Sequence, residues 1–123
     1  MAEYFTAKEL TCKCGCEAIE FDLTFLATLN AIREECGFPF TLSSAYRCPK
    51  HPIEARKSKP GAHSSGKAVD IACSGERALE VIRVAQKHGI SRIGIQQKGS
   101  GRFIHLDGCT EKDGFPSPAI WSY

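Results

Sequence analysis

The chain has 123 residues, of which 42% are hydrophobic and 24% charged, and its formal net charge is +2. This length supports one domain with a single core, and the composition is that of a soluble globular protein, not a disordered one. With 16 basic and 14 acidic residues, the charge is too balanced to indicate nucleic-acid binding. There is no apolar run of about 18 residues and no basic-then-apolar N-terminus, so we expect no membrane span and synthesis in the cytoplasm.

The N-terminal part of the chain predicts two helical segments. A short turn is expected at residues 7–10, where Thr6 is a suitable cap. A longer helix is expected over residues 23–36, because Asp22 is a good N-cap, apolar residues follow at helical spacing, and Gly37 is a typical C-terminal stop. Helical structure is therefore expected to precede the first strand.

Strands are expected where β-branched and aromatic residues gather between turn signals. Four runs meet this description, at residues 40–44, 68–72, 91–96 and 102–107. The glycine-containing stretch 97–101 joins the last two runs and predicts a hairpin.

The remaining segments complete the expected organisation. Ser74 is a suitable cap for a second long helix, expected over residues 76–88. Residues 46–61 contain three prolines and several charges, and are expected to form a long loop over the site. The tail, with Pro116 and Pro118, is expected to be irregular. Helices and strands do not alternate strictly, which favours an α+β fold with a small antiparallel sheet flanked by helices.

Two histidines and one aspartate are the most informative residues. His63 and Asp70 lie seven positions apart, on a predicted loop and the strand after it, and His105 lies in an apolar strand. Period-2 alternation places Phe103, His105 and Asp107 on one face of that strand. A lone histidine in an apolar strand is more often a hydrogen-bonded core residue, so spacing alone leaves both interpretations open. Three ligands with a fourth position left open are what a catalytic zinc needs.

Four motifs along the chain, taken in order, resemble those of one enzyme family. They are S-S-A-Y-R at residues 43–47, H-S-S-G-K-A-V-D at 63–70, R-I-G-I at 92–95 and F-I-H-L-D at 103–107. This pattern is similar to the D-alanyl-D-alanine carboxypeptidase family of zinc peptidases, which includes phage endolysins and shares a fold with the hedgehog signalling domain. The nearest likeness is to its small single-domain branch, whose members also carry an early cysteine cluster and a late tryptophan like Trp121.

The resemblance implies that His63, Asp70 and His105 bind one catalytic zinc ion. Two neutral imidazoles and one carboxylate leave the metal net positive, so that it can acidify a water ligand. The same ligand set accepts other divalent ions, so the sequence does not establish zinc as the physiological metal.

The resemblance also implies substrate-binding residues in the S-S-A-Y-R motif. Arg47 would bind a substrate carboxylate or stabilise a developing oxyanion. Ser44 and Tyr46 would orient Arg47 or line the substrate cleft, and for Tyr46 a packing role is an equal alternative.

The chain departs from the family pattern at the expected general base. Many members carry an acid three positions before the last metal histidine, or a histidine two positions before it. These positions hold Arg102 and Phe103 here, and neither can accept a proton from the attacking water. Asp107 is the remaining local candidate, either as the base or as the acceptor that sets the tautomer of His105. His51 is a more distant candidate.

Seven cysteines are many for a chain of this length. Cys12, Cys14 and Cys16 cluster near the N-terminus. With Cys48 they could hold a second, structural zinc ion, form a disulfide, or stay reduced as packing residues. The C-x-C-x-C spacing is tighter than that of most zinc sites, so all three interpretations stay open. The other cysteines are expected to be isolated, buried or half-buried thiols: Cys36, Cys73 and Cys109.

The function implied by the resemblance is that of a zinc metallopeptidase that cleaves D-amino-acid-containing stem or cross-link peptides of peptidoglycan by means of metal-activated water. Two alternatives stay open: a metal-binding but non-catalytic module for cell-wall peptides, and a cytoplasmic D-alanyl dipeptidase. Without a signal peptide, a cell-wall enzyme would be delivered by a phage-type or other non-Sec route. We expect a peptide substrate, no nucleic acid and a monomer, and the sequence does not identify the bond cleaved.

Overall fold

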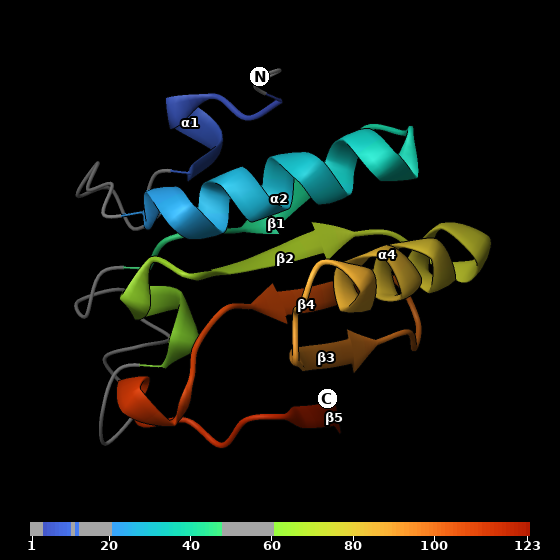
Figure 1. Cartoon of the computed structure of the whole chain (residues 1–123). Coiled ribbons are helices and arrows are strands. Elements are labelled where there is room, and N and C mark those ends of the chain that lie inside the picture. Colours follow the sequence, from blue (N-terminus) through green and yellow to red (C-terminus); the bar gives the residue numbers. More distant parts are fainter. Residues whose placement is uncertain (1–3, 11, 13–20, 48–60) are drawn as a thin grey trace.

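The computed structural model describes residues 4–10, 12, 21–47 and 61–123 of the chain. Five strands form one sheet in the order β1-β2-β4-β3-β5 (Figure 1). The strands are β1 (Thr41–Ser44), β2 (Ala68–Ala72), β3 (Arg92–Gln96), β4 (Phe103–Asp107) and β5 (Ala119–Ser122). The pairs β1–β2, β2–β4 and β3–β4 are antiparallel, and β3–β5 is parallel. The predicted α+β fold and its β3–β4 hairpin are confirmed.

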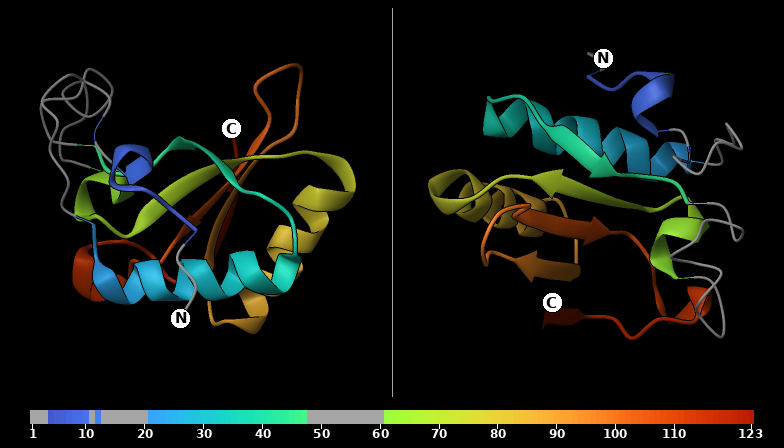
Figure 2. Two further views of the ribbon diagram at one scale, coloured as in Figure 1. Left: turned by 90° about the horizontal axis from the view of Figure 1, so that it is seen from above. Right: turned by 180° about the vertical axis from the view of Figure 1, so that it is seen from behind.

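Two long helices, α2 (Leu23–Cys36) and α4 (Gly75–Lys87), cover the same face of this sheet. Seen from behind, the strands lie in front of both helices (Figure 2). Single turns form α1 (Ala7–Leu10), η1 (Ala62–Ser65) and η2 (Glu111–Asp113). Apolar side chains from the two long helices and the strands form one core, whose fully buried members include Leu29, Ile32, Val69, Ile71, Val81, Val84, Ile104 and Leu106. None of the described helices is long and apolar enough to cross a membrane.

Alternation along the central strands separates this core from the opposite face of the sheet. In β2, Val69 and Ile71 belong to the core, whereas Asp70 between them does not. In β4, the same alternation places Ile104 in the core and His105 on the other side. Asp70 and His105 therefore share the face of the sheet away from the long helices.

The predicted boundaries of α2 are confirmed, together with the residues that set them. The Asp22 carboxylate accepts a hydrogen bond from the backbone N–H of Phe25 at 2.8 Å, as an N-cap does. At the other end Gly37 has a φ of +76°, in the left-handed region where a side chain would be strained. Helix α4 begins and ends one residue earlier than the predicted 76–88.

Loss of the α2 cap is expected to destabilise the protein. Asp22→Ala removes the acceptor for the Phe25 N–H and should lower the free energy of unfolding by about 1 kcal/mol. Asp22→Asn keeps a side-chain oxygen and should lower it by much less. Urea unfolding followed by circular dichroism measures both variants, and equal midpoints for alanine and wild type would show that the cap contributes nothing.

The expectation of an irregular tail is wrong. Residues after β4 form η2 and then β5, which pairs in parallel with β3. The backbone N–H of Ala119 donates to Ser91 O at 2.8 Å, and that of Tyr123 donates to Ile95 O at 3.3 Å. Two prolines just before β5 gave a loop signal, whereas the strand is stabilised by a partner more than twenty residues earlier in the chain.

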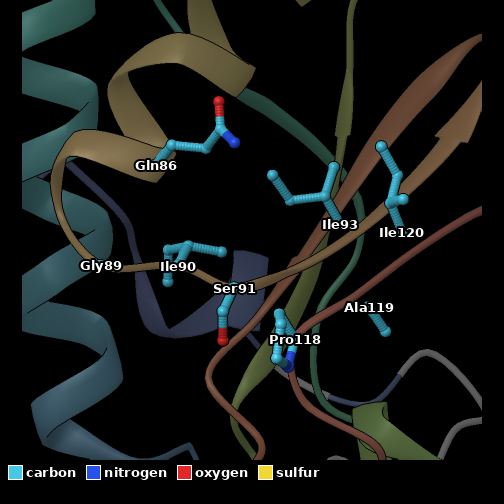
Figure 3. Close-up of a pocket in the computed structure, with 8 residues that line it drawn as sticks. All are labelled: Gln86, Gly89, Ile90, Ser91, Ile93, Pro118, Ala119 and Ile120. Atoms are coloured by element: carbon cyan, nitrogen blue, oxygen red, sulfur yellow. The ribbon is translucent and has the colours of Figure 1, made fainter.

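A groove of about 580 Å³ lies between the C-terminal end of α4 and the first residues of β3 and β5 (Figure 3). It is bordered by Ile90, Ile93 and Pro118, and by Ile120, which is 69% exposed. None of its lining residues is ionisable, and Ile120 alternates with Trp121, which lies on the other face of β5. The groove therefore lacks the chemistry of a catalytic site.

Candidate metal centre

The structure brings the three predicted metal ligands together. Asp70 of β2 and His105 of β4 are direct partners across the antiparallel ladder, and His63 lies on η1, the turn just before β2. All three residues are buried, and each offers one ligand atom within 4.8 Å of the other two. The sheet register and the preceding turn thus place a two-histidine, one-carboxylate set at one point.

The imidazole of His63 is oriented by the backbone of the segment after β1. Its Nδ1 lies 2.6 Å from the carbonyl oxygen of Ala45, and its Nε2 lies 3.3 Å from Oδ1 of Asp70. A carbonyl oxygen only accepts, so we assign the His63 proton to Nδ1. The Nε2 lone pair therefore faces the Asp70 carboxylate.

The imidazole of His105 is oriented by a second carboxylate. Its Nε2 lies 2.7 Å from Oδ2 of Asp107, and its Nδ1 lies 2.9 Å from Oδ1 of Asp70. With the proton on Nε2 donated to Asp107, Nδ1 is left to face Asp70. Metal-binding histidines in proteins are held in this way: the ring nitrogen that does not bind the metal, the outer nitrogen, donates its N–H to an oxygen acceptor.

This donor set fits a zinc ion. Both histidines use their outer nitrogen to donate, so two nitrogen lone pairs and a carboxylate oxygen converge, and a cation satisfies all three at once. Two imidazole nitrogens and one carboxylate oxygen are ligands that zinc prefers, and three such ligands leave a coordination position for water. His63, Asp70 and His105 are therefore the residues that would hold the metal.

The charges around the centre shift two pKa values. In the metal-free protein, burial by itself would raise the pKa of Asp70, but interaction with the protonated imidazoles of His105 and His63 outweighs burial and lowers that pKa well below its ordinary value. Burial alone would lower the pKa of His105, but its hydrogen bonds to Asp107 and Asp70 outweigh burial and raise that pKa. In the absence of metal, a proton on Nδ1 of His105 therefore competes for the position that the metal would occupy.

Zinc binding is accordingly expected to weaken as the pH falls. Because the pKa of His105 is raised, competition by its proton begins above pH 6.5, the ordinary value for histidine, and the apparent affinity should fall about tenfold per pH unit below the raised pKa. Competition titrations with a chelator of known affinity, at several pH values, measure this slope. An affinity independent of pH across the neutral range would contradict it.

Arg47 lies at the edge of the metal centre. Its Nη2 is 3.6 Å from Oδ2 of Asp70, and its Nε donates to Oγ of Ser44 at 3.0 Å. The Arg47 backbone is tied to η1, because its N–H donates to His63 O and its carbonyl accepts from Ser64 Oγ. Ser44 thus orients the guanidinium that the sequence had singled out.

Tyr46, the residue before Arg47, is buried. It forms a small apolar cluster with Cys12, against which Phe21 packs. Cys14, Cys16, Cys48 and His51 lie outside the described residues. These contacts fit the packing role of Tyr46, and its contact with substrate stays a prediction.

The remaining cysteines match their prediction as isolated thiols. Cys36 and Cys73 are half-buried and Cys109 is buried, all as free cysteines. Burial raises the pKa of Cys36 and of Cys73 to about 11. At neutral pH these two side chains are protonated and are poor nucleophiles.

Arg102 and Phe103, at the usual positions of the general base, provide no proton acceptor at the metal centre. Arg102 is exposed, and its Nε donates to Gly99 O within the β3–β4 hairpin at 2.9 Å. The ring of Phe103 packs against Tyr123, with 5.0 Å between ring centroids. Asp107, the remaining candidate, has a side chain that is 0% exposed.

Three residues near the centre were not predicted as site residues: Arg92, Trp121 and Tyr123. The Trp121 ring lies 5.2 Å from that of His105. This approach needs Gly94, because a Cβ there would be 2.6 Å from Nε1 of Trp121. A glycine inside a strand indicates close approach by another group, so Gly94 in R-I-G-I was the available signal. Burial raises the pKa of Tyr123, and the charge of Asp70 adds to this rise.

Comparison with known families agrees with the geometry. Residues 3–107 match the family model described as Peptidase M15, a stretch that includes the three metal-site residues and Arg47 but not η2 or β5. No curated protein sequence matches the chain significantly. Because the match covers most of the chain and includes the whole His-Asp-His set, the chain belongs to the peptidase M15 family.

Proposed function

We propose that this protein is a zinc-dependent peptidase that cleaves D-amino-acid-containing peptides of peptidoglycan. Membership of the M15 family supports a zinc metallopeptidase, and the peptidoglycan substrate is our extension of the sequence resemblance. The observation that carries the proposal is the convergence of His63 Nε2, Asp70 Oδ1 and His105 Nδ1 on one point. Zinc, when bound, supplies a Lewis acid and lowers the pKa of a water ligand towards neutrality.

The residues around the metal centre divide the remaining tasks. Arg47 is positioned to bind a substrate carboxylate or the oxyanion that develops during hydrolysis, since its guanidinium lies beside Asp70. Ser44 orients Arg47 through the hydrogen bond to Nε. We assign Asp107 the role of acceptor for His105 and not that of base, because both of its oxygens already accept hydrogen bonds inside the protein.

One observation favours a second candidate function, a metal-binding module that recognises cell-wall peptides without cleaving them. Arg102 occupies the usual position of an acid and points into the hairpin, and Asp107 is buried. The described part of the chain thus supplies no exposed carboxylate at the metal centre, where a general base would act. The two candidates differ in product formation but not in zinc binding.

Product analysis separates the candidates. Zinc-loaded protein is incubated with purified peptidoglycan fragments and, separately, with D-alanyl-D-alanine, and the products are identified by mass spectrometry. Peptides or D-alanine released from the fragments would support the proposal. Cleavage of the dipeptide alone would select a D-alanyl dipeptidase, and binding to cell walls without release would select the binding module. His63→Ala is the matched inactive control in each assay.

A further inference from the structure

Arg92 is a buried arginine beside the metal centre. It begins β3, is 7% exposed, and is the direct partner of Asp107 across the β3–β4 ladder. Its Nε donates to Oδ1 of Asp107 at 2.7 Å. A guanidinium so far out of water needs a charged partner, and Asp107 is that partner.

Asp107 connects Arg92 to a metal-site histidine. Its Oδ1 accepts from Arg92 and from the backbone N–H of Cys109 at 3.1 Å, and its Oδ2 accepts from Nε2 of His105. A carboxylate held by these donors can only accept from His105. The His105 proton therefore stays on Nε2, and Nδ1 stays directed at Asp70.

The C-terminal segment holds Arg92 from the other side. Its Nη1 donates to the carbonyl oxygen of Pro116 at 2.6 Å. The guanidinium carbon lies 4.8 Å from the ring centroid of Trp121 and 5.0 Å from that of Phe115. These residues lie beyond the stretch that matches the family, yet they contact Arg92 and, through the Trp121 ring, His105.

We propose that Arg92 is a positioning residue for the metal centre. Arg92 holds Asp107 as the acceptor for His105, and it couples the segment from Phe115 to Trp121 to zinc binding. The inference rests on the metal site of the proposed function but not on peptidase activity. The proposed role of Arg92 differs from that of a purely structural ion pair, because Arg92 would affect metal binding through Asp107.

A double-mutant cycle on zinc affinity tests the inference. Arg92→Gln should weaken zinc binding about 10–100-fold, the usual effect of losing a partner behind a metal ligand. In the Asp107→Asn background, Arg92→Gln should cause little further loss, because the connection is already broken. Equal losses in both backgrounds, or an unchanged affinity for Arg92→Gln alone, would overturn the inference. Arg83→Gln removes an exposed arginine paired with Glu80 and is the matched control.

A spectroscopic measurement adds a readout that a purely structural role would not move. In metal-free protein above the pKa of His105, ¹⁵N–¹H correlation spectra should show the Nε2–H tautomer of His105 in wild type and a mixture in Arg92→Gln. If Arg92→Gln does not fold, Arg92→Lys, which keeps a point charge without the planar donor geometry, should bind zinc more weakly than wild type, and wild-type affinity would contradict the inference. A wild-type protein that fails to bind zinc would contradict the proposed function itself, whereas an unaffected Arg92→Gln contradicts only this step.

Discussion

His63→Ala is expected to weaken zinc binding by more than about 100-fold, because it removes a ligand and not merely a group behind one. Loss of the metal should also abolish peptide cleavage. The sheet should remain folded, since His63 lies on the η1 turn, whereas Asp70 and His105 lie in central strands with several buried partners. The choice of His63 therefore separates loss of metal from loss of structure.

Zinc content after dialysis and chelator competition measure the effect of His63→Ala, with circular dichroism as the test of folding. His88→Ala is the matched control, because His88 follows α4, pairs with Glu35 and makes no contact with the centre. Zinc bound by His63→Ala with wild-type affinity would place the metal elsewhere and contradict the assignment.

Arg47→Ala is expected to reduce kcat/KM by about 10²–10³-fold while zinc affinity changes little. The Arg47 guanidinium lies beside the Asp70 carboxylate. From there it would pair with a negative charge on the substrate or on the developing oxyanion. Its loss removes the positive charge but leaves all three metal ligands in place. Arg47→Lys keeps the charge without the planar, two-pronged donor geometry and should fall between alanine and wild type.

Steady-state kinetics on a defined peptide decides which role Arg47 has. A rise in KM alone would indicate binding of a substrate carboxylate, whereas a fall in kcat would indicate an interaction made in the transition state. Arg102→Ala is the matched control, because Arg102 is exposed and bonded within the hairpin. An unchanged kcat/KM for Arg47→Ala would exclude both roles.

Local signals in the sequence were sufficient for most of the secondary structure. The cap at Asp22 and the stop at Gly37 placed α2 at its observed bounds, because capping depends on neighbouring residues. Alternation placed His105 and Asp107 on one face of β4, because side chains in a strand point to opposite sides in turn. The spacing of His63, Asp70 and His105 was not sufficient to predict a metal site. The prediction depended on the order of the four motifs that resemble the zinc peptidase family.

Other features depended on contacts between distant segments. Among the described strands, β5 pairs with β3 alone, so its local sequence, which begins just after Pro118, could not reveal it. The sequence allows two roles for Asp107, because its partner, Arg92, comes from another strand.

By itself, then, the sequence determined the three α-helices and the first four strands, because caps and alternation are local in the chain. It indicated the His63, Asp70 and His105 set only through the resemblance of four motifs spread over residues 43–107. Only the tertiary structure decided that the two imidazoles turn one nitrogen each towards Asp70. It also decided that Arg92 contacts both Asp107, the acceptor for His105, and Trp121 of the C-terminal strand. The physical reason is that the orientation of an imidazole is set by the acceptor on its outer nitrogen. For both histidines that acceptor is positioned by the packing of the sheet and its adjoining segments.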